Sequence, residues 1–329
     1  MTLLGVAALG GSLAVAAPVQ VPTGARAAVT LERRPGAGAP VLLVHGIASR
    51  GAFFDLGPGE DFADVLSQAG FDVWLVDLRG HGHSRDGYGG APGGLDAYGT
   101  ADLRAAIDHV RATTGAPQVG LVGHSMGGMA AGVLLATGGH PALGALVVLG
   151  SPVDFRSPDG LRAVGRAGMR LGGVLPRIGV PAMARWASRW RRLPFGLEDA
   201  LWSPGSLTAA ERAALLHGGV SPMFPAEQRQ IARAIRRGGL LAQGAPALPA
   251  IDQSPVPILA VAGAGDRVAP PETVRRWAAG TGGPREWVLA GVDAGFPADL
   301  GHCDLVVGRA AREAVAPRVA RFLGAHLGG

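Results

Sequence analysis

The sequence predicts an α/β fold, in which a mostly parallel, doubly wound sheet carries an inserted helical cap. Three observations lead to this prediction. Short apolar runs, typical of buried parallel strands, alternate with helical segments over most of the chain. The run at 119–122 turns directly into a helical Ala/Leu/Met/Val segment, as the first half of a βαβ unit does. Between residues 153 and 254 this alternation stops.

The expected core comprises residues 19–152 and 255–329, since a chain of 329 residues can bury one large core with one insertion. The first strands are expected as a hairpin within 19–34. The later strands are expected at the apolar runs 41–44, 73–76, 119–122, 145–149, 256–262 and 286–289. A helix is expected over 271–279. Hydrophobic content of 48% and charged content of 17% are ordinary for a buried parallel sheet.

The segment 153–254 is expected to fold as a helical cap over the core. It is basic, because 151–254 holds 14 Arg against 7 acidic residues, whereas the rest of the chain holds 16 against 18. Thr208 and Glu211 have the spacing of a capping box before a helix at 209–216. Two sets of residues recur at helical spacing, namely Arg162, Arg166 and Arg170, and Met183, Trp186 and Trp190. We expect the second set to pack the cap on the core or to line an acyl pocket.

Residues 123–128, Gly-His-Ser-Met-Gly-Gly, form a tight turn with Ser125 at its apex. Gly123 and Gly127 leave room there for the neighbouring strand and helix, and the helix N-terminus points N–H groups at an anion formed beside Ser125. The pattern G-x-S-x-G alone is weak in a chain with 54 glycines, and an ordinary βα turn is the alternative. The strand before it and the helix after it favour a nucleophile elbow.

A serine nucleophile needs a base, usually a histidine that a carboxylate orients. Asp266 follows the run 256–262, and His302 lies in a loop beyond the run 286–289, which is the chain order Ser, Asp, His. Asp154, after the run 145–149, is the alternative acid. Taken singly, Asp266 could be a helix N-cap and His302 a surface residue.

The backbone N–H groups of Ile47 and Met126 are the expected oxyanion hole. Gly46 would let the chain turn after the run 41–44, so that the N–H of Ile47 faces Ser125. We expect His45 to brace this loop rather than to act as a base. A substrate pocket is expected from His45, His124, Trp186 and Trp190.

With these residues in place, the chain resembles the α/β-hydrolase superfamily, in particular its cap-bearing serine esterase and lipase-like members. The resemblance covers roughly 19–150 and 255–327 and rests on His45-Gly46, the run Asp-Leu-Arg-Gly-His-Gly-His-Ser at 77–84, the turn at 123–127, Asp266 and Gly301-His302. It implies a Ser125–His302–Asp266 triad, hydrolysis of a carboxylic ester through an acyl-enzyme, and no cofactor. A thioesterase or acyltransferase would use the same triad, and a non-catalytic binding protein could keep the fold.

Other site chemistries find less support in the sequence. His81, His83 and Asp86 form H-x-H-x-x-D in a glycine-rich loop without a further ligand at suitable spacing, which disfavours a metal site. The residues 263–265, Gly-Ala-Gly, lack the third glycine of a dinucleotide loop, and the chain has no lysine for a phosphate-binding loop. Cys303 is the single cysteine, so no intramolecular disulfide can form.

The expected partner is a small ester with an apolar acyl group, and no nucleic acid is expected. The net charge of +5 results from 30 basic residues, all Arg, against 25 acidic residues. The basic cap is expected to contact anionic membrane surfaces weakly. The apolar residues 1–18 are expected outside the core as a possible signal or anchor, although no basic residue precedes their apolar stretch. A cytoplasmic location is favoured, with secretion or membrane anchoring as the alternative.

Overall fold

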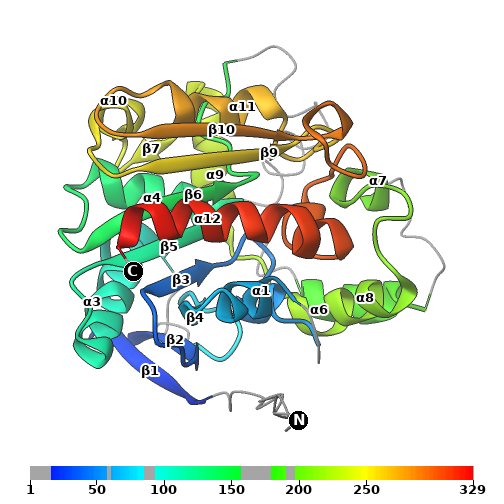
Figure 1. Ribbon diagram of the computed structural model, residues 1–329, viewed down its shortest axis with the longest axis horizontal. Coiled ribbons are helices and arrows are strands. Elements are labelled where there is room, and N and C mark those ends of the chain that lie inside the picture. Colours follow the sequence, from blue (N-terminus) through cyan, green and yellow to red (C-terminus); the bar gives the residue numbers. More distant parts are fainter. Residues whose placement is uncertain (1–15, 58–60, 85–92, 157–178, 190–196, 329) are drawn as a thin grey trace, which may run out of the picture.

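A computed structural model of the protein describes residues 16–57, 61–84, 93–156, 179–189 and 197–328 (Figure 1). Its centre is an eight-stranded sheet in the order β1-β2-β4-β3-β5-β6-β9-β10. The strands are β1 (Ala16–Gly24), β2 (Ala27–Arg34), β3 (Pro40–Val44), β4 (Asp72–Asp77), β5 (Val119–His124), β6 (Leu143–Leu149), β9 (Ile258–Gly263) and β10 (Arg285–Ala290). β1–β2 and β2–β4 pair antiparallel and all the other neighbours pair parallel, so the predicted mostly parallel sheet is confirmed. β1 begins at Ala16, inside the segment 1–18 that the sequence places outside the core.

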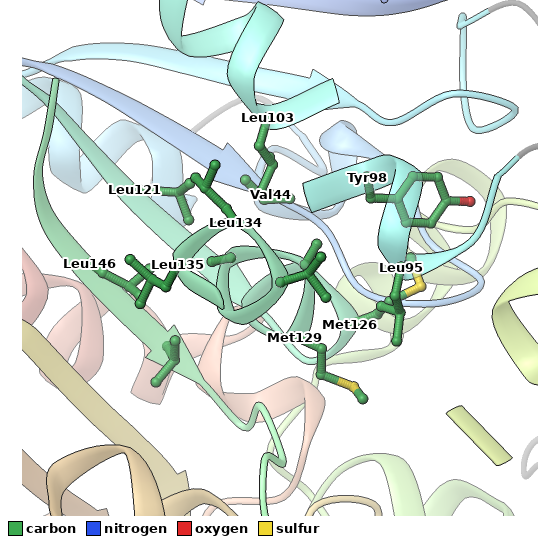
Figure 2. Packing of buried hydrophobic residues seen from close by; sticks show 14 of the residues in the cluster. Val44, Leu95, Tyr98, Leu103, Leu121, Met126, Met129, Leu134, Leu135 and Leu146 are labelled. Carbon is green, nitrogen blue, oxygen red and sulfur yellow. The ribbon is translucent and has the colours of Figure 1, made fainter. Parts of the chain in front are cut away.

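Helices cover both faces of this sheet, which explains why the central strands are apolar along their whole length. α1 (Phe62–Gln68) and α12 (Ala316–Leu327) pack on one face, in a core cluster with side chains of β3, β5, β6 and β9. α3 (Leu103–Thr114), α4 (Met126–Ala136), α10 (Leu248–Gln253) and α11 (Pro271–Arg275) belong to the cluster on the other face. Figure 2 shows the packing around α4, where Leu134 and Leu135 lie beside Leu121 and Leu146 of the sheet.

Helices also make up most of the described part of the segment 153–254. They are α6 (Val180–Ala187), α7 (Leu197–Leu201), α8 (Ala209–Ala214), α9 (Pro225–Arg237) and α10, with a small hairpin of β7 (Leu241–Ala242) and β8 (Ala245–Pro246) before α10. The predicted capping box of α8 is confirmed, since Glu211 N–H donates to Thr208 Oγ1 at 3.2 Å and Thr208 N–H donates to Glu211 Oε2 at 2.7 Å. In Figure 1, α6 and α8 lie beside each other at the right of the view, and α7 lies apart, above them.

The later part of this segment is built into the core. Ile231 of α9, Leu240 before β7 and Ile251 of α10 belong to the same buried cluster as the strands. By contrast, Met183 and Trp186 of α6 are 61% and 51% exposed. Within the described ranges, no helix has the length and apolar character needed to cross a bilayer.

Candidate active site

Ser125 stands between the end of β5 and the start of α4, in a backbone conformation that L residues rarely adopt. Its φ is +52° and its ψ is −117°. Such strained positions cost about 1–3 kcal/mol and concentrate at functional sites. The glycines on either side are required, because a Cβ on Gly123 would lie 2.5 Å from Gly128 N and one on Gly127 would lie 2.3 Å from Val44 O. This turn lifts the serine hydroxyl above the carboxyl edge of the sheet.

The carboxyl ends of β5, β6 and β9 bring Ser125 to the side of two further polar residues. Ser125 N–H donates to Leu149 O at 2.9 Å, at the end of β6. The next residue, Gly150, has a φ of +54° and donates its N–H to Val261 O of β9 at 2.8 Å. A Cβ on Gly150 would lie 3.2 Å from both Asp266 Oδ2 and His302 Nδ1. The three strand ends therefore place Ser125, Asp266 and His302 around one point.

Asp266 orients the ring of His302. His302 Nδ1 lies 2.8 Å from Asp266 Oδ2, and both side chains are almost completely buried. The other carboxylate oxygen of Asp266 accepts the N–H groups of Val268 and Ala269, each at 2.8 Å. These bonds hold the carboxylate in a turn before α11, rather than at the helix N-cap itself. With Nδ1–H donated to Asp266, Nε2 of His302 carries the lone pair that can take a proton.

Asp154, the alternative acid, is engaged elsewhere. Its carboxylate pairs with Arg156 at 2.6 Å, and this hydrogen-bonded pairing lowers the pKa of Asp154. Its backbone forms a bridge to Gly239 of the cap. The structure thus brings Asp266, and not Asp154, to His302.

Ser125 and His302 are not hydrogen-bonded to each other in the described part of the structure. Among the described contacts, none links Ser125 Oγ to His302 Nε2. Both residues are buried, with 7% and 5% of their surface exposed. Bonds between a nucleophile and its base are often long without substrate and shorten only in the complex.

His124 holds the main chain of His302 in place. Its Nε2–H donates to the backbone carbonyl of His302 at 3.1 Å, and its ring lies stacked on Phe53 with centroids 5.0 Å apart. Burial, together with the neighbouring His302, lowers the pKa of His124 well below its usual value, so the ring is neutral. His124 is only 3% exposed, so its ring supports the base and offers a substrate little surface.

The expected oxyanion donors lie beside Ser125 with their N–H groups available. Neither Ile47 N–H nor Met126 N–H donates to another residue in the described ranges. A Cβ on Gly46 would lie 3.1 Å from Ser125 Cβ, so the loop that carries Ile47 runs against the turn at Ser125. Met126 is the first residue of α4, where N–H groups lack intrahelical acceptors.

His45 braces this loop, as the sequence predicts. Its Nδ1–H donates to Gly46 O at 2.8 Å, and its Nε2 accepts Leu78 N–H at 3.2 Å. Burial and the neighbouring His81 lower the pKa of His45 to about 4, which keeps the ring neutral. With 0% of its surface exposed, His45 has no atom to offer a substrate, in contrast to the pocket role expected from the sequence.

The described contacts of the run 77–84 hold neighbouring loops and helices in place. Asp77 accepts Gly51 N–H at 2.7 Å and His83 N–H at 2.6 Å, and Arg79 pairs with Asp102 at 2.6 Å. His83 is exposed, and Asp86 lies outside the described residues. No group of three His, Cys, Asp or Glu suited to a metal ion occurs in the part of the chain that the structure describes.

His81 binds a residue that the sequence analysis did not single out. Its Nε2 lies 2.5 Å from Glu227 Oε1 of α9, and Tyr98 O–H donates to the same oxygen at 2.5 Å. All three side chains are fully buried. Glu227 Oε2 also accepts Phe224 N–H at 3.0 Å, but Phe224 has no side-chain acceptor for the reciprocal bond of a capping box, so the local sequence does not signal this role.

The remaining predicted residues are not all near the site. Trp190, like Arg162, Arg166 and Arg170, lies outside the described residues. Cys303, next to His302, is buried, and burial raises the pKa of its thiol, so it is a packed neighbour and not a second nucleophile.

Comparison with known proteins assigns the family. Residues 39–294 match the sequence profile of the alpha/beta hydrolase fold family, so the chain belongs to this family and the predicted resemblance is confirmed. The chain is 37% identical over 103 residues to Lipase 1 of Drosophila melanogaster, a stretch that covers 29% of this chain but only 23% of that lipase.

Solved structures agree on the fold. Bromoperoxidase from Bacillus anthracis superposes with a TM-score of 0.64 at 17% identity, over 93% of this chain and 99% of that one. A thermophilic esterase from Thermogutta terrifontis gives 0.61 at 19% identity, over 94% and 98%. At these identities the two structures establish the architecture and leave the reaction open.

Proposed function

We propose that the protein is a serine hydrolase of carboxylic esters in which Ser125 is the nucleophile, His302 the general base and Asp266 the residue that orients it. The observation that carries this proposal is the 2.8 Å contact between His302 Nδ1 and Asp266, located beside a serine with a φ of +52°. The similarity to a lipase supports the same class of substrate.

The proposed reaction has two halves. Ser125 Oγ attacks the ester carbonyl carbon while His302 Nε2 takes its proton, and the N–H groups of Ile47 and Met126 bind the resulting oxyanion. The C–O bond to the alcohol then breaks, and His302 returns the proton to the departing alcohol. Water attacks the acyl-enzyme by the same route, so that the acid leaves and Ser125 regains its proton.

The cap is proposed to select apolar acyl groups. Met183 and Trp186 expose large apolar side chains on α6. Arg185 of α6 and Arg189, two residues after the helix, are exposed too, and no acidic residue occurs between 179 and 189. Aromatic and thioether groups favour acyl chains, and the arginines favour anionic surfaces. Sedimentation with vesicles that contain or lack an anionic lipid measures the second property, and weak binding only to the anionic vesicles is expected.

A panel of p-nitrophenyl esters of increasing acyl length tests the proposal. Wild type should hydrolyse them, and Ser125→Ala should not, while keeping the same thermal unfolding midpoint. Product analysis with and without an added alcohol or thiol separates hydrolysis from acyl transfer. If wild type turned over no ester of the panel, the proposal would be abandoned in favour of the alternative, a binding protein with a hydrolase fold.

A further inference from the structure

The loop that carries Ile47 is bonded through its main chain to the cap. Ser221 N–H donates to Ala48 O at 2.8 Å, and Arg50 N–H donates to Gly219 O at 3.2 Å. Ser49 and Val220 accordingly form an antiparallel bridge. Three residues, 222–224, separate the cap residues 219–221 from the start of α9 at Pro225, so we expect a displacement of the start of α9 to reach residues 48–50.

Ala48, next to Ile47, is held in a strained conformation. Its φ is +58°, in the left-handed region where a Cβ crowds the backbone. The carbonyl of this residue is the acceptor of the Ser221 N–H bond. We expect the chain at Ala48 to relax if that bond is lost. The N–H of Ile47 belongs to the peptide group between Gly46 and Ile47, two peptide groups before the Ala48 carbonyl, so such a relaxation would alter its direction.

Glu227 anchors the start of α9 from inside the protein. Its carboxylate accepts bonds from three elements, namely His81 Nε2–H at 2.5 Å, Tyr98 O–H at 2.5 Å and Phe224 N–H at 3.0 Å. The loop of His81 is joined to the cap a second time, because Gly82 N–H donates to Ser221 Oγ at 3.3 Å.

Glu227 is also connected to the loop that carries Ile47 through the rings of His81 and His45. The ring of His81 lies 4.9 Å from the ring of His45, centroid to centroid. His45 in turn bonds Gly46 O. Two sets of contacts therefore connect Glu227 to the loop that carries Ile47. One runs through residues 219–221, and the other runs through His81 and His45.

The electrostatics show that Glu227 is held as a carboxylate. Burial raises its pKa, but the charge interaction with His81 and the hydrogen bonds from His81, Phe224 and Tyr98 outweigh burial and lower the pKa below its usual value. Displacing one partner of a buried ionic group leaves an uncompensated charge in the interior, so we expect the carboxylate and its donors to keep one arrangement.

We propose that Glu227 is a positioning residue for the oxyanion hole: it fixes residues 219–221 and His81, and through them the direction of the Ile47 N–H. It touches no substrate. The inference rests on the proposed function, since it assumes that Ile47 N–H binds an oxyanion at Ser125.

Glu227→Gln tests the proposal, because the amide keeps the size of the side chain and loses one acceptor oxygen and the charge. We expect kcat on a p-nitrophenyl ester to fall about tenfold or more, short of the roughly 10²–10³ that loss of a whole oxyanion donor costs. KM should change little, because the oxyanion interaction forms only in the transition state. The affinity for an alkyl boronic acid, whose adduct on Ser125 is tetrahedral, should fall by the same factor as kcat/KM.

Glu211→Gln is the matched control. Like Glu227, Glu211 accepts the N–H of the residue three positions before it at the start of a cap helix, and it pairs with Arg312 of the core at 2.6 Å. No hydrogen bond or ion pair of Glu211 within the described residues reaches the loop that carries Ile47. This variant should keep the kcat and the boronic acid affinity of wild type. Equal losses in both variants would show a general weakening of the cap and overturn the proposal.

Unchanged kcat and boronic acid affinity in a folded Glu227→Gln protein would overturn it as well. If that variant does not fold, Tyr98→Phe removes one donor from the carboxylate, and it should lower both quantities by a smaller factor; no change there contradicts the proposal. A wild type without Ser125-dependent turnover would refute the proposed function itself, whereas an active wild type with an unaffected Glu227→Gln refutes only this inference.

Discussion

Asp266→Asn is the sharpest test of how the base is oriented. In the structure, Oδ1 of Asp266 accepts two N–H groups, from Val268 and Ala269, and Oδ2 faces His302 Nδ1 at 2.8 Å. Asparagine has one oxygen and one NH₂ group. The two N–H donors will retain the oxygen, so the NH₂ group turns to His302 and needs an acceptor there. Nδ1 then loses its proton and Nε2 gains one, which is the tautomer that cannot take the proton of Ser125.

The expected loss is large because the wrong tautomer disables the base. By analogy with other triads, kcat should fall about 10⁴-fold, which corresponds to about 5.5 kcal/mol of transition-state stabilisation. The assay is steady-state hydrolysis of a p-nitrophenyl ester, with circular dichroism and thermal unfolding to verify the fold. Asp154→Asn is the control, since Asp154 pairs with Arg156, and it should retain kcat. A loss below tenfold for Asp266→Asn, or a large loss for Asp154→Asn, would refute the assignment.

Two further predictions concern the cap and the loop. Trp186→Ala should flatten the dependence of kcat/KM on acyl length, since each buried CH₂ contributes about 0.8 kcal/mol, close to a fourfold change in kcat/KM. The kcat/KM for an acetate ester should be nearly unaffected. An equal loss at every chain length would show that the cap is only a structural lid. The second prediction follows from the pKa of His45, which is lowered to about 4. Because the unfolded chain binds a proton near pH 6.5 and the folded protein does not, stability should fall as pH drops from about 6.5 towards 4, by up to about 3 kcal/mol from this residue. Urea unfolding across that range should show a shallower pH dependence in His45→Asn, and an unchanged slope would contradict this.

Much of the fold and of the site can be predicted because their signals are local. An apolar run beside glycines identifies β5 and the turn at Ser125 within a dozen residues, and Asp266 directly follows another such run. Chain order then singles out His302. Each of these residues follows a strand or a turn that its own neighbours in sequence specify.

The residues that the sequence analysis missed depend on distant contacts. Glu227 and His81 are 146 positions apart, and only the path of the cap brings them together. In the sequence, Glu227 is one of seven acidic residues in an Arg-rich segment, which gives no sign that it is buried. The same limit applies to α6, where helical spacing predicts a common face for Met183 and Trp186 but not that this face is exposed.

Labelling with a fluorophosphonate tests the central claim, that Ser125 is an activated nucleophile, most directly. The account predicts one adduct on wild type, located at Ser125 by peptide mass analysis, with loss of ester turnover in proportion to labelling. Ser151→Ala, which alters a neighbouring buried serine whose hydroxyl donates to Gly123 O, should label like wild type. Ser125→Ala should be folded and unlabelled. An adduct of equal yield on Ser125→Ala, or a wild type that turns over esters without labelling at Ser125, would contradict the account.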